Sequence, residues 1–200
     1  MALARMDANL AAEANPLAHE AVPGPARWVN GRTVAWQPPN PYPSYAAAFV
    51  LLARVRNGLP AVLLSKEQRG RDLKLGLLGG KREDGDGGSP FNTVCREAWE
   101  ETSELLSRAT QQRLLRGDVV GPLAWIAQSR AVAMVCLADT ADDDVDMRAA
   151  AAANGAALEW VATFLLLSPS WRTANMHTHA AWAVEAVATS LGLVRPAPPA

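Results

Sequence analysis

Stretches of apolar residues divide the middle of the chain into segments of strand and helix length. Residues 45–55 are almost wholly apolar, which is typical of a buried strand. Asn57 and Gly58 then predict a tight hairpin turn, with the returning strand at residues 60–65. Three later apolar segments predict further strands, and the second of them is interrupted at residues 128–130: residues 75–78, 124–138 and 157–163.

Helix signals lie between and after these strands. Ser89 can cap free amide groups and Pro90 suits the first helical position, so a helix is expected over residues 90–106. A run of aspartates leads into a short alanine-rich helix that Asn154-Gly155 would end. A final helix is expected over residues 178–191, whereas residues 66–74 predict a charged loop. Because strands precede, separate and follow helices, we expect an α/β fold in which helices enclose a mixed sheet.

Proline content separates the first 44 residues from this pattern. Prolines that break long helices and central strands indicate a loosely ordered lead over residues 1–44. Trp28 and Trp36 lie within it and could add a short edge strand. The domain is therefore expected to span residues 45–194, followed by a flexible Pro/Ala-rich tail at residues 195–200.

Composition limits the class of protein. The 200 residues suit one domain with tails, and a 50% hydrophobic content is enough for a sizeable core. The net charge of -1 argues against a general polyanion binder, so long nucleic acid is not an expected partner. No apolar run approaches the roughly 18 residues that span a bilayer, and the first 20 residues carry no signal-peptide pattern, so a cytoplasmic protein is expected. Cys95 and Cys136 are then expected to be reduced thiols in the core.

The helix that begins at Pro90 gathers acidic residues on one face. A helical wheel places Glu97, Glu100, Glu101 and Glu104 together, opposite an apolar face. Like charges at these spacings repel, and only Arg96 is near enough to relieve them. By itself such a face favours a plain solvated surface. The alternative is a divalent cation held by carboxylate oxygens.

The loop before the helix changes this balance. A short apolar strand runs into Gly79-Gly80-Lys81 and further glycines, and the loop leads directly to the acidic helix. Glycines allow positive φ angles and a close approach of backbone to a ligand. Together the loop and helix favour a site for a metal ion and phosphate.

At this point the sequence resembles a known family. Residues 80–104 resemble the Nudix box, Gly-x5-Glu-x7-Arg-Glu-U-x-Glu-Glu-x-Gly-U, in which U is apolar. The segment Arg96-Glu97-Ala98-Trp99-Glu100-Glu101 matches the central part at every specified position, and Gly79-Gly80-Lys81 matches the entry.

The chain also departs from the box. Asp86 stands where the first glutamate is expected, and Gly87 and Gly88 lengthen the spacer by two residues. Ser103 replaces the later glycine and Glu104 occupies an apolar position. Ser103 favours a helix that continues to Ser107.

The resemblance implies a Nudix-like α/β/α sandwich and a Nudix hydrolase activity. It implies that Glu97, Glu100 and Glu101 bind Mg²⁺ or Mn²⁺, with the carbonyl of Gly80 as a further ligand. Arg96 would orient the glutamates by ion pairing.

The implied reaction is hydrolysis of a diphosphate linkage that joins a nucleoside to another moiety. Gly79, Gly80 and Lys81 would lie beside this substrate, although Lys81 is equally well explained as an exposed residue. The expected partner is a small nucleotide or nucleotide-derived diphosphate, with a homodimer as a further possibility. Five acids are candidates for the general base, each also explicable as an ordinary surface acid: Glu83, Asp86, Asp139, Asp142 and Glu159.

Other interpretations stay open. The irregular box motivates a catalytically weak or inactive nucleotide-binding module on the same fold, and a small structural domain with an acidic helix is a third reading. His177 and His179 have a spacing that could serve zinc on a strand, but capping or surface roles fit the nearby helix better. Trp125 or Trp28 is a weak candidate for stacking on a nucleobase.

Overall fold

The structure, a computed structural model, describes residues 45–69, 72–121, 123–126, 129–152 and 157–190, together with the backbone of residues 27–29 and 32–35. Within these residues nine strands form one sheet: β1 (Arg27–Val29), β2 (Arg32–Ala35), β3 (Ala47–Arg56), β4 (Leu59–Arg69), β5 (Asp72–Gly76), β6 (Leu78–Lys81), β7 (Ala124–Ile126), β8 (Ala131–Leu137) and β9 (Leu158–Ala162). The helices are α2 (Pro90–Glu101), α3 (Arg108–Arg116), α4 (Val145–Ala151), α5 (Thr163–Leu166), α6 (Pro169–Asn175) and α7 (Thr178–Ser190), with 3-10 turns η2 (Asp84–Asp86) and η4 (Thr140–Asp142).

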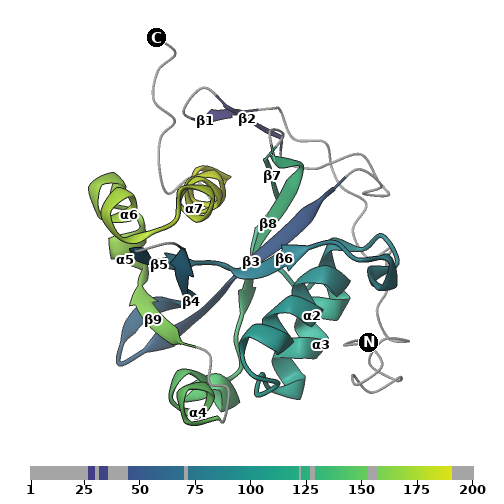
Figure 1. Cartoon of the computed structure of the whole chain (residues 1–200), viewed down its shortest axis with the longest axis vertical. Helices are drawn as coiled ribbons and strands as arrows, with labels where there is room; N and C mark the ends of the chain where they lie inside the picture. Colours follow the sequence, from purple (N-terminus) through teal and green to yellow (C-terminus); the bar gives the residue numbers. More distant parts are fainter. Residues whose placement is uncertain are drawn as a thin grey trace.

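The sheet is mixed and has helices on both faces. Its strand order is β1-β2-β7-β8-β3-β4-β5, with β6 paired to β3 and β9 to β4. β3 and β8 run parallel, while the other pairs are antiparallel. Figure 1 shows α2 and α3 on one side of β3 and β8 and α7 on the other. The predicted α/β architecture with a mixed sheet between helices is confirmed.

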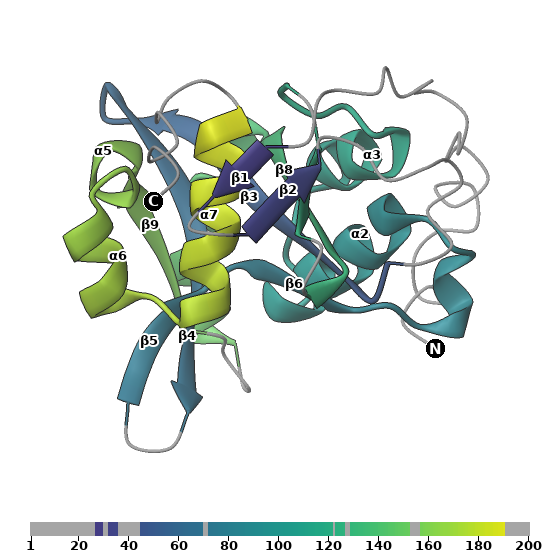
Figure 2. The ribbon, with the colours of Figure 1, turned by 90° about the horizontal axis from the view of Figure 1, so that it is seen from above.

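Alternation along β3 divides the core into two halves. Val50 and Leu52 join the cluster that α2, α3 and α4 cover, whereas Leu51 joins the cluster under α7. Successive side chains of a strand point to opposite faces, so a continuous apolar run is required where both faces are covered. Figure 2 shows α5, α6 and α7 gathered on one side, away from α2 and α3.

Several local predictions are confirmed. Asn57 and Gly58 adopt φ angles of 50° and 79° and close the β3–β4 hairpin. Strands β7 and β8 occupy the predicted segment, and α7 matches the predicted final helix. Cys95 and Cys136 are free and buried. Trp28 lies in β1, which reaches the sheet through β2 and β7. Trp36, Asn154-Gly155 and the tail lie outside the described residues.

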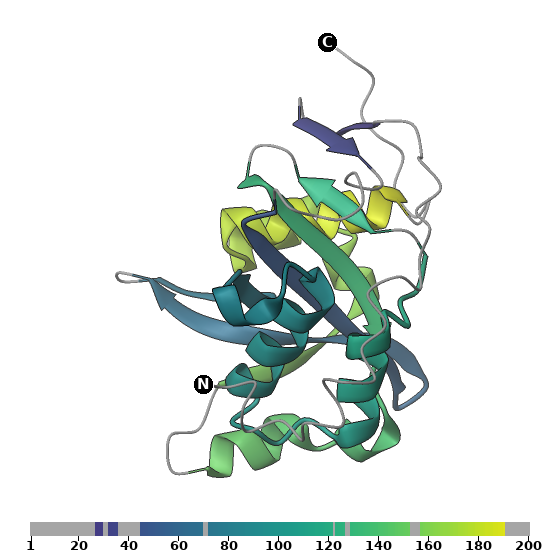
Figure 3. The ribbon, with the colours of Figure 1, turned by 90° about the vertical axis from the view of Figure 1, so that its right-hand side faces the viewer.

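The prediction of a charged loop at residues 66–74 is wrong. β4 and β5 continue as a paired ladder in which Glu67 lies opposite Lys74 and Lys66 opposite Leu75. An oppositely charged cross-strand pair stabilises a ladder, so charge did not mark a loop here. Figure 3 shows this hairpin projecting from the body of the domain.

The acidic helix ends earlier than the sequence predicted. α2 stops at Glu101, because Ser103 and Glu104 adopt left-handed φ angles of 56° and 64°. The Glu104 amide donates to the Trp99 carbonyl at 2.8 Å and the Ser103 amide donates to the Glu100 carbonyl at 3.0 Å, which is a Schellman ending. Ser103 therefore serves as the left-handed residue usually supplied by glycine, and Glu104 leaves the acidic face. α3, which follows after Ser107, was not predicted.

Within the described part of the chain, no helix has the length and apolar character needed to cross a membrane.

Candidate functional site

The packing of α2 fixes the position of the acidic residues. Val94, Cys95 and Ala98 are fully buried against the sheet, where α2 packs on β6 and β3. This packing places Glu97 and Glu101, beside the buried face, against the glycine-rich strand β6. The helix begins after Ser89 with Pro90 at its first turn, as predicted, although the Ser89 side chain makes no capping hydrogen bond.

Two glycines let the helix carboxylates lie against the backbone of β6. The Gly79 amide donates to Glu101 Oε2 at 2.9 Å. Gly79 has a φ of 136°, and a Cβ there would lie 2.2 Å from the Ala48 carbonyl oxygen. A Cβ on Gly80 would lie 2.4 Å from the Glu97 carboxyl carbon. Any larger residue at either position would displace the strand or the glutamate.

Arg96 is a buried cation that ties the loop to the helix. Its Nε donates to Asp86 Oδ1 at 3.0 Å and its Nη2 to Asp86 Oδ2 at 3.2 Å. Nη2 also donates to the Lys81 carbonyl at 2.9 Å. Arg96 is 3% exposed and Asp86 is fully buried, so the pair forms an internal brace between η2, β6 and α2.

This brace removes Asp86 from the candidates for the general base. Besides Arg96, its carboxylate accepts from Thr93 Oγ1 at 2.7 Å and from the Glu83 amide at 2.8 Å. Burial alone would raise the pKa of Asp86, but these donors and the Arg96 charge hold it below its ordinary value. A fully buried, fully engaged carboxylate has no path to a water nucleophile.

The two additional glycines of the box form the turn that makes this contact. Gly87 and Gly88 have φ angles of 60° and 79° between η2 and α2. The two extra residues of the spacer therefore form a left-handed turn, and Asp86 still contacts Arg96.

The remaining guanidinium nitrogen of Arg96 faces the glutamates. Nη1 lies 2.9 Å from Glu97 Oε1 and 3.4 Å from Glu100 Oε2. Glu97 is 18% exposed and Glu100 is 45% exposed at the side chain. Desolvation by burial raises the pKa of Glu97, and the Arg96 charge opposes this shift. Arg96 thus orients two carboxylates, of which Glu97 lies beside Gly80.

Glu101 lies in the least favourable environment for a negative charge. Burial raises the pKa of Glu101 to about 8, with further upward contributions from Glu97, Glu67 and Glu100. The Gly79 amide offsets only part of this effect. Four acidic side chains therefore interact around the Gly76–Gly80 segment, and a divalent cation would relieve their repulsion.

The oxygen donors present fit Mg²⁺ or Mn²⁺, which prefer carboxylates. Among the described residues, however, no three His, Cys, Asp or Glu side chains converge closely enough to hold an ion as they stand. Glu97 and Glu100 are turned toward Arg96, so cation binding requires their carboxylates to rotate. His177 and His179 lie at the start of α7, where the His177 amide donates to the Leu75 carbonyl, and among the described residues they are in no group of three or more such side chains.

The other acids considered as bases have distinct surroundings. Asp142 is fully buried and accepts from the Ser107 amide at 2.7 Å at the start of α3. Asp139 accepts from the Ala141 amide, and Glu159 pairs with Lys66 at 2.8 Å. Glu83 is exposed and lies 3.7 Å from Arg96. Lys81 is exposed at the end of β6.

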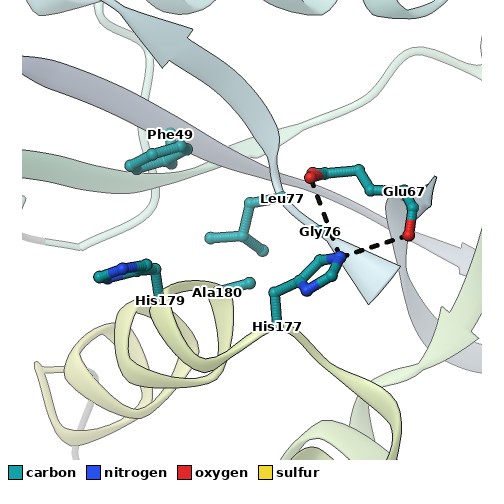
Figure 4. Close-up of a pocket in the computed structure, with 7 residues that line it drawn as sticks. All are labelled: Phe49, Glu67, Gly76, Leu77, His177, His179 and Ala180. Atoms are coloured by element: carbon teal, nitrogen blue, oxygen red, sulfur yellow. Dashed lines mark hydrogen bonds and ion pairs between the residues drawn. The ribbon is translucent and has the colours of Figure 1, made fainter. Parts of the chain in front are cut away.

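A cavity that no sequence pattern predicted lies at the junction of β5 and β6, beneath the start of α7. Phe49, Glu67, Leu77, His177 and His179 line a space of about 140 Å³, shown in Figure 4. Glu67 had been placed in a charged loop, so nothing in the local pattern marked it. Phe49 lies within an apolar run, and nothing in that run distinguishes it from the core residues on either side.

The aromatic candidates proposed from sequence lie elsewhere. Trp125 is half-buried and packs against the core on the α2 side of the sheet. The side chain of Trp28 is outside the described residues.

No family model matches the chain, and no curated protein sequence matches it. Among solved structures, it is similar to the crystal structure of a Nudix hydrolase from M. smegmatis, RenU. The two share 16% sequence identity with a TM-score of 0.43, over 76% of this chain and 90% of that chain. The function proposed below therefore rests on the chemistry of the site residues themselves.

Proposed function

We propose that this protein is a Mg²⁺- or Mn²⁺-dependent pyrophosphohydrolase that cleaves a nucleoside diphosphate linked to another moiety. The main support is Glu101, a half-buried residue whose desolvated carboxylate accepts from the Gly79 amide and lies among other acids. Such an arrangement is costly without a cation, because like charges in a desolvated site oppose ionisation. Perturbed acids of this kind concentrate at functional sites.

Each residue of the site has a part in this proposal. Glu97, Glu100 and Glu101 hold the cation, with the Gly80 carbonyl as a further ligand. Arg96 directs Glu97 and Glu100, since its guanidinium already lies against both. A bound divalent cation would neutralise phosphate oxygens and lower the pKa of a coordinated water.

The backbone and the exposed side chains complete the site. Gly79 and Gly80 carry no side chain that would keep a diphosphate away from the strand, and Lys81 supplies a positive charge at its end. One carboxylate of the cluster accepts the proton released by the attacking water. The groups that would hold the diphosphate therefore lie on β6 and α2, two regular elements that pack against each other.

The direct test compares Glu101→Gln with Glu104→Gln in a phosphate-release assay over a nucleotide panel with Mg²⁺ or Mn²⁺. Both changes remove one carboxylate near the end of α2, and Glu101 is the one that accepts from the Gly79 amide of β6, whereas Glu104 is exposed. Glu101→Gln is expected to reduce cleavage by roughly 100-fold or more, since even supporting residues at metal sites are worth about 10–100-fold. Glu104→Gln is expected to retain activity.

Three outcomes separate the alternatives. Equal cleavage by wild type and Glu101→Gln would remove the site from the mechanism. Nucleotide binding without cleavage across the panel would favour a catalytically inactive binding module. The absence of any rise in melting temperature with Mg²⁺ would favour a structural domain, since a ligand that binds only the folded state must stabilise it.

A further inference from the structure

The sheet forks next to the glutamates. β3 and β4 pair from Leu52–Leu63 to Arg56–Leu59 and then diverge. Past this point β3 pairs with β6, and β4 pairs with β5. Leu77 joins β5 to β6 across the fork. A cavity occupies this region because no strand fills the space between the diverging arms.

This cavity, which we call the fork cavity, has apolar walls and a polar end. Phe49 and Leu77 come from the sheet, and Ala180 comes from α7. Figure 4 shows Glu67 and His177 together at one end and His179 near Phe49 at the other. An adjoining cavity of about 180 Å³ shares Phe49 and His179 and extends to Ile126 and Trp182. Both are smaller than the roughly 300–1,000 Å³ of drug-sized pockets, so the fork cavity suits a ring rather than a whole nucleotide.

The fork cavity lies beside Gly79, the residue of β6 that also contacts the carboxylate site. A Cβ at Gly79 would lie 3.0 Å from Phe49 Cδ1, so the Phe49 ring lies directly against the residue whose amide binds Glu101. Glu67, at the opposite end, is one of the acids whose charge acts on Glu101. A substrate with its diphosphate at the glutamates would therefore extend its neighbouring group into this space.

The position of Glu67 is fixed by Gly76, His177 and Ser65, whose Oγ donates to Glu67 Oε1 at 3.4 Å. A Cβ on Gly76 would lie 1.9 Å from Glu67 Oε1, so the carboxylate rests on bare backbone. His177 Nε2 lies 3.3 Å from the Glu67 carbonyl oxygen and 4.0 Å from its Oε2. His177 is itself anchored, since its amide donates to the Leu75 carbonyl at 3.0 Å. Glu67 is thus a positioned acceptor, because an ionised carboxylate only accepts hydrogen bonds and does so at about four sites.

We propose that the fork cavity binds the heterocyclic base of the substrate, and that Glu67 accepts two hydrogen bonds from adjacent N–H donors on its edge. Guanine carries such a pair, a ring N–H beside an exocyclic amino group, and its apolar faces suit Phe49 and Leu77. The assignment rests on the proposed function, and it narrows the substrate to a guanine-type nucleotide. Glu67 and Phe49 would determine specificity and would not act on the phosphates.

The test measures binding of GMP and IMP by calorimetry, with Mg²⁺ present. Neither nucleotide has a phosphoanhydride, so binding is read without cleavage. The two differ only by the amino group that would donate to Glu67. Wild type is expected to bind GMP about tenfold more tightly than IMP, since one charge-assisted hydrogen bond is worth at least that much.

Variants assign the preference to the cavity. Glu67→Gln is expected to bring GMP and IMP affinities within about twofold of each other, because an amide cannot accept both donors. Phe49→Leu is expected to weaken both ligands alike, and Glu104→Gln is the control that should change neither. On a cleaved guanine nucleotide, Glu67→Gln should raise KM with little change in kcat.

The two proposals can fail separately. Equal binding of GMP and IMP by wild type, or an unchanged preference in Glu67→Gln, overturns the base assignment whether or not the protein cleaves nucleotides. A GMP preference that depends on Glu67, in a protein that cleaves no nucleotide, supports the fork cavity and refutes the hydrolase. A fall in kcat without a change in KM for Glu67→Gln would reassign Glu67 to the chemical step and overturn the specificity role.

Discussion

Replacing Glu101 by glutamine is expected to stabilise the metal-free protein while it removes activity. The glutamine side chain has nearly the same shape and keeps an oxygen that can accept from the Gly79 amide. It removes only the negative charge, which lies in a desolvated position among Glu97, Glu67 and Glu100. The charge is therefore unfavourable for folding in the absence of a cation.

The magnitude follows from the pKa of Glu101, which is about 8 in the folded protein against 4.5 for an unperturbed side chain. Because the pKa is higher in the folded protein than in the unfolded chain, the stability linked to Glu101 is fully present below pH 4.5. This stability is lost as the pH rises through 8, where the folded protein must ionise Glu101. At about 1.36 kcal/mol per pH unit, the upper limit of the loss is about 5 kcal/mol. Because solvent reaches the end of α2, we expect about 2–4 kcal/mol at pH 9.

The assay is thermal unfolding of wild type, Glu101→Gln and Glu104→Gln in EDTA at pH 5, 7 and 9. For a chain of this size each kcal/mol corresponds to roughly 2–4 °C. Glu101→Gln should exceed wild type by roughly 5–15 °C at pH 9 and by much less at pH 5. Saturating Mg²⁺ should raise the melting temperature of wild type and close most of this gap.

A particular result would refute this reasoning. If Glu101→Gln were destabilised in EDTA at pH 9 as much as at pH 5, the carboxylate would not be the strained group that the structure indicates. An identical gain from Glu104→Gln would show that net charge alone is responsible.

Three further predictions concern the rest of the site. Gly80→Ala should weaken the Mg²⁺-induced rise in melting temperature and lower cleavage, because its Cβ would lie 2.4 Å from the Glu97 carboxyl carbon. Asp86→Asn should cost about 3–5 kcal/mol in urea unfolding, since it removes the fully buried partner of Arg96 and leaves only the more exposed Glu97 and Glu100 beside that charge; a loss under 1 kcal/mol would contradict the brace. Ser103→Gly should raise stability by about 1 kcal/mol with unchanged cleavage, because Ser103 has a φ of 56°; calorimetry compared with the assay checks both parts.

Local sequence patterns predicted most of the elements on which the site depends. Apolar runs identified β3 and β8, and Asn57-Gly58 identified the turn between β3 and β4. Ser89-Pro90 located the start of α2. These predictions are confirmed because helix starts, turns and strand periodicity each depend on a few adjacent residues. Helical spacing alone also predicts that Glu97, Glu100 and Glu101 share one face of α2.

Local patterns did not predict features that depend on contacts between segments or on an unusual backbone conformation. The end of α2 was missed because Ser103 supplies a left-handed residue normally expected of glycine. The β4–β5 ladder was missed because its charged residues pair across strands. The role of Asp86 depended on a turn at Gly87 and Gly88 that returns its carboxylate to Arg96.

The sequence by itself determined that three glutamates and an arginine lie on one helix behind a glycine pair, because 3.6 residues per turn and a short loop leave no other arrangement. Only the tertiary structure decided that the Glu101 carboxylate accepts from the Gly79 amide and that Glu67 and His177, 110 positions apart, meet at the same cavity. Such meetings depend on strand register and on the packing of α7, which long-range pairing sets and no local pattern encodes.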